Sequence, residues 1–181
     1  MVMQTESKDI YLMMQKDQEK GLRMIMARFS EPLYWHIRRL LVSHDDTQDA
    51  LQNTFVKVYR SFHTLKEPAS LSSWIYRIAT HEALDMKQRQ NRADHMLDSS
   101  EDNTANIAAE SYIDYSDLEA VKLQKAILSL PPKQQVVFNL HYYDEMNFSD
   151  ISNVTGTTLS TAKVNYHLAK EKIIRYMNSN D

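Results

Sequence analysis

The fold of this chain is decided by residues 130–172, LPPKQQVVFNLHYYDEMNFSDISNVTGTTLSTAKVNYHLAKEK. Asn147 and Asp150 have capping-box-like spacing, in which Asn147 caps a short helix and the Asp150 carboxylate faces its dipole. Gly156 suits a left-handed turn, and Thr158 can cap a last helix. The expected inward stripe of that last helix is Leu159, Ala162, Tyr166, Ala169 and Ile173. A short helix, a glycine turn and a longer capped helix predict a helix-turn-helix.

The outward face of the last helix carries side chains that could contact duplex DNA in a major groove. Hydroxyl and ammonium groups can bind phosphates, a histidine can reach a base edge, and an aliphatic side chain can touch a thymine methyl. Because this face lacks arginine, a merely solvated face is the open alternative. The candidate residues are Ser160, Thr161, Lys163, Val164, His167, Leu168 and Lys170.

The preceding part of the chain has the hydrophobic spacing of a helical cluster. Helices are expected over about residues 8–28, from Ser30, where Ser-Glu-Pro is a typical start, from Asp45 or Asp46, and from Ser70 to about Arg92. Residues 94–119 contain eight Asp and Glu and no Lys or Arg, a composition typical of a linker. The prediction is an all-α fold: two small helical domains, residues 1–93 and 118–181, joined by an acidic flexible linker, residues 94–117.

The helix from Ser70 has a face on which aromatic and cationic side chains alternate. Trp74, Arg77 and His81 recur there at helical spacing. This mixture suits single-stranded DNA, because unpaired bases stack on aromatic rings while cations follow the backbone. The alternative is that Trp74 and Tyr76 complete the hydrophobic core.

A second exposed stripe is expected on the helix over about residues 47–62. It consists of Asp49, Gln52, Val56 and Tyr59, opposite the core positions of that helix. Partly apolar stripes of this kind can dock a partner protein. Contact with the first helix of the same domain is the alternative.

Composition excludes several classes of function. The 181 residues include no cysteine, which excludes disulfides, thiolate metal sites and a cysteine nucleophile, and only two glycines, too few for a glycine-cradled nucleotide. The seven histidines never form a paired metal-binding motif. We therefore expect no catalysis, cofactor, metal or small-molecule substrate. The lack of a long apolar stretch and of a signal-peptide core predicts a cytoplasmic location.

Three segments, taken in order, resemble one known family. They are DALQNTFVKVYRSF at 49–62, SLSSWIYRIATHEALD at 70–85, and the stretch at 130–156 with its TAKVNYHLAKEK helix. They resemble the successive characteristic regions of the extracytoplasmic-function (ECF) sigma factors of bacteria, within the sigma-70 superfamily. The resemblance covers roughly residues 20–92 and 118–176, and SWIYRIA and LPPKQQ are its most specific parts.

The resemblance implies a promoter-recognition subunit whose partners are core RNA polymerase, promoter DNA and an anti-sigma factor. It implies that the first domain binds polymerase and opens the minus-10 element, that the linker enters the polymerase channel, and that the second domain reads the minus-35 element as duplex. The implied polymerase contacts are Asp49, Gln52, Phe55 and Tyr59. The implied minus-10 contacts are His63, Lys66, Trp74, Arg77, His81 and Asp85, and the implied minus-35 contacts are Ser160, Thr161, Lys163, Val164, His167 and Lys170.

Two departures from the family's pattern concern base recognition. Thr80 and His81 stand where the family commonly has an Arg-Asn pair, and Val164, Asn165 and Leu168 replace polar or arginine residues. The alternative function is a self-sufficient helix-turn-helix regulator, which would usually bind a palindromic site as a dimer. Such a regulator would bind duplex DNA without polymerase, whereas a sigma factor needs polymerase for strong promoter binding.

Overall fold

The computed structural model describes residues 2–96 and 118–179, with side chains within 6–92 and 118–179. The described residues form helices and turns and no strand, so the predicted all-α class is confirmed. None of the described helices has both the length and the apolar character of a membrane span. The chain divides into two compact units, residues 1–91 and 92–181. Of the predicted linker, residues 97–117 lie outside the described part of the chain.

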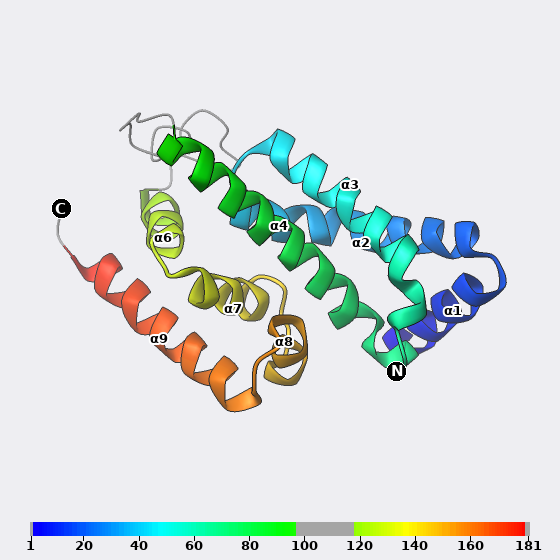
Figure 1. Ribbon diagram of the computed structural model, residues 1–181. Coiled ribbons are helices and arrows are strands. Elements are labelled where there is room, and N and C mark those ends of the chain that lie inside the picture. The colour runs from blue at the N-terminus through cyan, green and yellow to red at the C-terminus, as the bar shows by residue number, and fades with distance from the viewer. Residues whose placement is uncertain (1, 97–117, 180–181) are drawn as a thin grey trace. The chain divides into compact units, whose positions relative to one another are not determined.

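In its described residues, the first unit has four α-helices and two short 3-10 turns. Figure 1 shows how these helices are arranged. Their bounds are α1 Val2–Lys16, α2 Gln18–Leu41, α3 His44–Ser61, η1 Phe62–Thr64, η2 Pro68–Ser70 and α4 Leu71–Met96. Helix α2 packs against both α1 and α3. Most of the large, fully buried side chains are aliphatic and recur at helical spacing, and His36 of α2 is fully buried among them. The aliphatic ones are Ile25, Leu33, Ile37 and Leu40 of α2, Val58 of α3, and Leu71 and Ile75 of α4.

The first helix boundary lies at Asp17, so the predicted helix start at Ser30 is wrong. The Asp17 carboxylate caps α2 by accepting the Lys20 amide at 3.0 Å, and this hydrogen bond is the main cause of the lowered pKa of Asp17. Ser30 and Pro32 lie inside α2. The helix continues through Pro32, which faces solvent, because its buried stripe is unbroken: Ile25, Phe29, Leu33 and Ile37.

Helix α3 is capped by Ser43 and not by the predicted Asp45 or Asp46. The Ser43 hydroxyl accepts the Asp46 amide at 3.3 Å, which leaves both carboxylates in the first turn, where the helix dipole favours them. Val42 precedes the cap with a φ of 68°, and the Ser43 amide donates to the Leu41 carbonyl at 2.8 Å. This closes a tight γ-turn, a strained conformation for a β-branched residue.

The second unit consists, in its described residues, of α6 Leu118–Leu128, α7 Pro132–Tyr142, α8 Phe148–Thr155 and α9 Leu159–Asn178. Helix α9 packs against each of the other three (Figure 1). One hydrophobic cluster joins α6, α7 and α9, and its buried members are Ala126, Ile127, Leu130, Phe138, Ala169 and Ile173.

The predicted helix-turn-helix is formed by α8, Gly156 and α9. The Asn147 side chain accepts the Asp150 amide at 2.9 Å, Gly156 has a left-handed φ of 65°, and the Thr158 hydroxyl accepts the Thr161 amide at 3.1 Å. All three predicted turn and cap positions are therefore confirmed. Three members of the predicted inward stripe are buried, Tyr166 is half-buried, and Leu159, at the first position of α9, is 46% exposed.

Candidate nucleic-acid and polymerase interfaces

The outward face of α9 is open to solvent along its length. The predicted minus-35 residues are all exposed on it: Ser160, Thr161, Lys163, Val164, His167 and Lys170. Two of these already have partners, since the Thr161 hydroxyl lies 2.8 Å from the Thr158 hydroxyl and the His167 Nε2 lies 3.5 Å from the Glu171 carboxylate. Hydroxyl, cationic and aliphatic groups on one face can contact both phosphates and base edges. The Glu171 carboxylate opposes phosphate binding there.

An aromatic cluster supports α9 from beneath this face. The Tyr166 ring of α9 lies 5.9 Å from Phe138, 4.5 Å from His141 and 5.6 Å from Phe148 between ring centroids. The His141 ring is held in turn, because its Nδ1 bonds the Met146 carbonyl at 2.8 Å and its face stacks on Phe148. The cluster thus joins α7 and α8 to the middle of α9 and fixes which face α9 presents.

The face of α4 that was predicted to bind the minus-10 strand is also exposed. Arg77, His81 and Asp85 are exposed at helical spacing, and in the described structure none of them has a hydrogen bond or ion pair. Trp74 is half-buried, and its indole N–H donates to the Thr64 hydroxyl at 3.3 Å. That bond ties the start of α4 to the η1 turn. The two remaining predicted contacts, His63 and Lys66, are exposed in the connection from α3 to α4.

The buried side of α4 contains a hydrogen-bonded network that sequence reasoning missed. The Thr80 hydroxyl donates to the Tyr76 carbonyl at 2.7 Å, so at 2.9 Å it accepts from the Nε2–H of His36 on α2. The His36 ring also meets the Tyr76 ring edge to face at 5.1 Å. Thr80 and Tyr76 are both buried. Tyr76 is therefore part of the core, which the sequence had left open as the alternative to strand binding. His81, the neighbour of Thr80, is the exposed member of the Thr80-His81 pair.

The stripe on α3 separates into exposed and buried members. Asp49 and Gln52 are exposed, Val56 is 43% exposed and Tyr59 is 37% exposed. Phe55 is only 7% exposed and packs inside the first unit. An acidic, an amide and two partly apolar side chains therefore share one surface, and Phe55 supports that surface from beneath.

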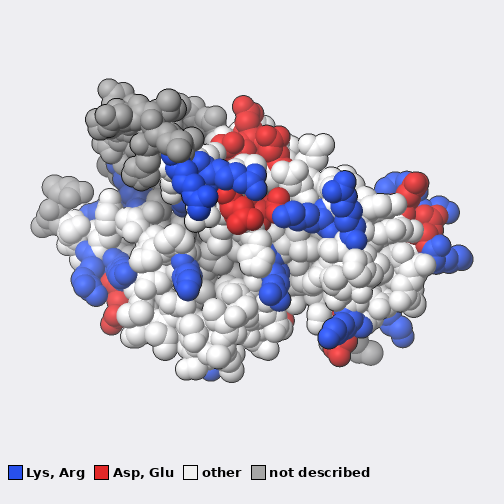
Figure 2. Space-filling model, viewed as in Figure 1, with Lys and Arg blue, Asp and Glu red and all other residues white. Residues whose placement is uncertain are grey.

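Charge is unevenly distributed over α3 and α4. Figure 2 shows Asp and Glu gathered over the start of α3, with Lys and Arg over the later part of α4. The Asp46 carboxylate at the start of α3 accepts a hydrogen bond from Gln90 of α4 at 2.6 Å. The later part of α4 carries Arg89 and Lys87, and burial lowers the pKa of Lys87. Lys87 and Arg89 are two positions apart on α4, so they point to different sides of the helix and do not form one cationic stripe with Arg77.

Comparison with known families assigns both units. Sigma-70 region 2 matches residues 25–93, and Sigma-70 region 4 matches residues 120–173. The chain belongs to the ECF sigma factors of the sigma-70 family. This sigma factor therefore directs promoter-specific initiation of transcription by RNA polymerase. The helix-turn-helix built from α8 and α9 lies within the region 4 match.

Curated relatives cover most of this sigma factor at low identity. It is 24% identical to the ECF RNA polymerase sigma factor SigW of Bacillus subtilis over 168 residues, which are 87% of this chain and 89% of SigW. It is 22% identical to the ECF RNA polymerase sigma-E factor of Haemophilus influenzae, with 88% of each chain covered.

Two solved structures share the fold. The chain is similar to CnrH, solved in complex with the cytosolic domain of CnrY, with a TM-score of 0.71, 14% identity and 98% of each chain covered. It is also similar to the sigma factor RpoE, solved with the anti-sigma factor NepR from Bartonella quintana, with a TM-score of 0.68 and 18% identity. That comparison covers 92% of this chain and 99% of RpoE.

Proposed function

We propose that residues 1–93 bind core polymerase and the melted minus-10 strand, that the acidic residues 94–117 enter the polymerase channel, and that residues 118–181 read the minus-35 element. The polymerase contact is the α3 surface of Asp49, Gln52 and Tyr59, with Phe55 beneath it. The minus-35 contact is the outward face of α9. Both surfaces are exposed and carry the mixed polar and apolar groups that such contacts use.

Binding of the melted minus-10 strand is supported most strongly by the face of α4 that carries Trp74, Arg77 and His81. Trp74 is half-buried, and its indole N–H bonds the Thr64 hydroxyl, so one edge of the ring is held and the ring can serve as a stacking platform for an unpaired base. Arg77 and His81 follow it on the same face with no partner in the described structure, so both can bind the strand. A base must leave the duplex before its pairing edge is read. The Trp74 ring, next to a guanidinium of Arg77 that has no partner in the described structure, suits the capture of such a base. Thr80 bonds His36, which assigns base recognition at that pair to His81.

The test is transcription in vitro with sigma-free core polymerase and a promoter library, followed by Trp74→Ala. We expect new transcript starts that share two upstream elements. The alanine variant should bind core polymerase normally but melt the promoter about fivefold less well, because one stacked base contributes roughly 1–3 kcal/mol. Melting is measured by the fluorescence of 2-aminopurine in the minus-10 strand.

The matched control is Trp35→Ala, which removes the other tryptophan of the chain, on α2, outside the proposed strand site. It should leave melting by the folded protein unchanged. If Trp74→Ala weakens core binding and melting equally, Trp74 belongs to the core of the first unit and the minus-10 proposal fails.

We propose further that this sigma factor acts in the cytoplasm, where polymerase and promoter DNA meet, and that it has no catalytic activity. An anti-sigma factor is its proposed regulator, supported by the similarity to RpoE in its complex with NepR. Purified sigma factor bound to such a regulator should fail to join core polymerase, which native gel electrophoresis measures. Simultaneous binding of both would contradict inhibition by this route.

A further inference from the structure

The outward face of α9, the helix drawn in orange to red in Figure 1, has an aliphatic centre. Val164 and Ile173 are nine residues apart, so at 3.6 residues per turn they point to opposite sides of the helix. Ile173 is 6% exposed and belongs to the core, whereas Val164 is 54% exposed. Leu168 follows Val164 one turn later on the same face and is 38% exposed. The side of α9 that is turned away from its own core is therefore apolar at two successive turns.

These aliphatic side chains form a line with a hydroxyl group at the start of the helix. Ser160 stands one turn before Val164, so Ser160, Val164 and Leu168 follow one another at steps of four residues. Neither Val164 nor Leu168 belongs to the hydrophobic cluster that joins α6, α7 and α9. The next turn of this face carries Glu171, so the aliphatic part is confined to the turns nearest the start of α9. In a helix-turn-helix, that part of the second helix contacts base edges.

The lysines of α9 flank this line instead of lying on it. At 100° per residue, Lys163 and Lys170 point about 100° and 120° to one side of Val164, and Lys172 points about 80° to the other side. All three are exposed, and none makes a hydrogen bond or ion pair within the described residues. Ammonium groups at both edges can bind phosphates on both walls of a major groove, which places the line against the base edges between them.

An aliphatic side chain in this place distinguishes between bases. Thymine presents a 5-methyl group in the major groove, whereas guanine, adenine and cytosine present donors and acceptors that an aliphatic group leaves unpaired. Arginine is the side chain that most often reads guanine, and the arginine of α9, Arg175, lies in the last turn. The centre of the face is therefore built for a methyl group and not for a guanine edge.

We propose that Val164 and Leu168 select thymine in the minus-35 element through its 5-methyl group, while the flanking lysines hold the phosphates. The two side chains are about 6 Å apart along the helix axis and successive base pairs are about 3.4 Å apart, so they can meet different base pairs. This inference rests on the proposed reading of the minus-35 element by α9. It adds the feature of the base that is read and the residues that read it.

The experiment uses holoenzyme and the promoter selected in vitro, with each thymine of the minus-35 element replaced singly by uracil. Uracil pairs as thymine does and lacks only the methyl group. Wild-type holoenzyme should bind about three- to fourfold more weakly at two positions, the ratio expected for one methyl group left in water. Val164→Ala should not distinguish thymine from uracil at one of these positions, and Leu168→Ala should not do so at the other. Fluorescence anisotropy of labelled duplex measures the affinities.

Ile174→Ala is the matched control, because Ile174 is a 49% exposed aliphatic residue of α9 that lies about 15 Å further along the helix than Val164. It should show the wild-type response to uracil. Val164→Ile keeps a branched aliphatic group and should retain the preference for thymine at its position.

The outcomes separate this inference from the minus-35 proposal. If replacement of the whole minus-35 element weakens binding but no uracil does, the inference is overturned and the minus-35 proposal stands. If both alanine variants keep the full wild-type response to uracil, another group reads the methyl and the inference is also overturned. If replacement of the whole element leaves the affinity unchanged, both fail. Loss of core polymerase binding by Val164→Ala would assign the line to a protein contact and overturn the inference.

Discussion

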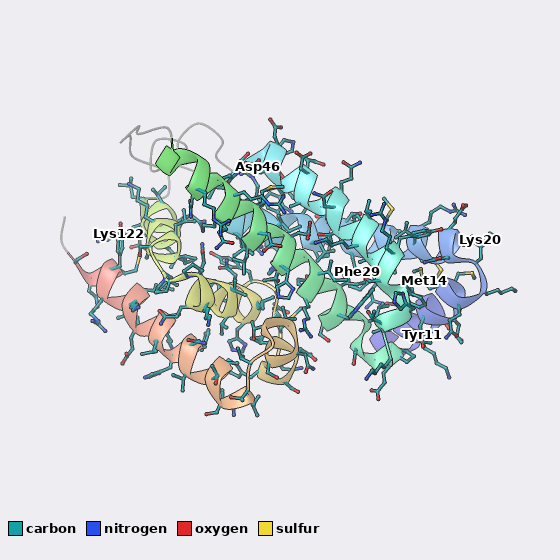
Figure 3. All side chains as sticks on the ribbon, viewed as in Figure 1. Tyr11, Met14, Lys20, Phe29, Asp46 and Lys122 are labelled. Carbon is teal, nitrogen blue, oxygen red and sulfur yellow. The ribbon has the colours of Figure 1, made fainter. Side chains whose placement is uncertain are left out.

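Both units have an apolar core, but they differ in the side-chain contacts that join their helices around it. In the first unit, polar side chains join helices far apart in sequence: His36 with Thr80, Asp46 with Gln90, Gln18 with the Tyr59 carbonyl, and Lys57 with Glu82. In the second unit, the rings of Phe138, His141, Phe148 and Tyr166 meet between helices. Side-chain caps such as those of Asn147 and Thr158 are local to this unit, and Lys122 of α6 bonds the Ser179 carbonyl at 2.6 Å. Figure 3 labels Asp46 and Lys122, one from each set.

The difference indicates what each unit tolerates. Hydrogen bonds fix distance and direction, so α4 is held at a defined rotation about its axis, as a strand-binding face requires. Ring packing contributes mainly through buried area and shape, so the second unit depends on volume. Substitutions that change polarity should affect the first unit most, and substitutions that change volume should affect the second.

The largest expected effect is that of Phe138→Ala in the second unit. Phe138 is 4% exposed, belongs to the hydrophobic cluster of this unit and stacks on Tyr142 and Tyr166. The substitution should lower the free energy of unfolding of this unit by about 3–5 kcal/mol. Hydrogen exchange should report opening of α6 to α9 while α2 and α3 stay protected. Equal loss of protection in both units would show that the units do not unfold separately.

The next effect in size concerns the His36–Thr80 bond of the first unit. Thr80→Val keeps the shape but leaves the His36 N–H buried without this acceptor, at a cost of about 1–3 kcal/mol. Adding His36→Leu should restore most of the stability, because both partners are then apolar. Chemical denaturation of the three variants measures this. If the double variant is less stable than Thr80→Val alone, ring packing on Tyr76, rather than the hydrogen bond, is what His36 contributes.

Local signals in the sequence predicted the second unit better than the first. Asn147, Gly156 and Thr158 act through backbone groups within four residues, so their roles can be read from short spacing. Ser30 carried an equally good start signal and failed, because the stripe through Phe29 and Leu33 keeps α2 helical. A tertiary contact outweighed a local preference there.

The residues of the candidate site also divide into those that local spacing predicts and those that depend on tertiary contacts. Helical spacing was enough to predict that Arg77, His81 and Lys163 lie on outward faces, since a period of 3.6 fixes sidedness. It could not predict that Thr80 bonds His36, which lies 44 residues away. Such a pair depends on how the helices pack against one another, which periodicity does not encode.

Substitutions at two turn residues with positive φ should change stability by smaller amounts and in opposite directions. Gly156→Ala in the second unit places a Cβ at a φ of 65° and should cost about 1 kcal/mol or slightly more. Val42→Gly in the first unit relieves a β-branched residue at a φ of 68° and should raise the melting temperature by a few degrees. Calorimetry of both variants tests the pair. A lower melting temperature for Val42→Gly would mean that the contacts of the valine side chain outweigh its backbone strain.

The smallest expected effect is electrostatic and concerns the outward face of α9. Glu171 lies 3.5 Å from His167 and presents a carboxylate beside the proposed phosphate contacts. Glu171→Gln removes that repulsion and releases His167, so the holoenzyme should bind a minus-35 duplex about two- to threefold more tightly, consistent with the small energies of exposed ion pairs. Glu19→Gln makes the same charge change on α2 of the first unit and should have no such effect. Because the gain is electrostatic, it should shrink as salt is raised from low to physiological concentration. If the gain in affinity is independent of salt, or if Glu19→Gln shares it, Glu171 does not act by repelling DNA phosphates at this face.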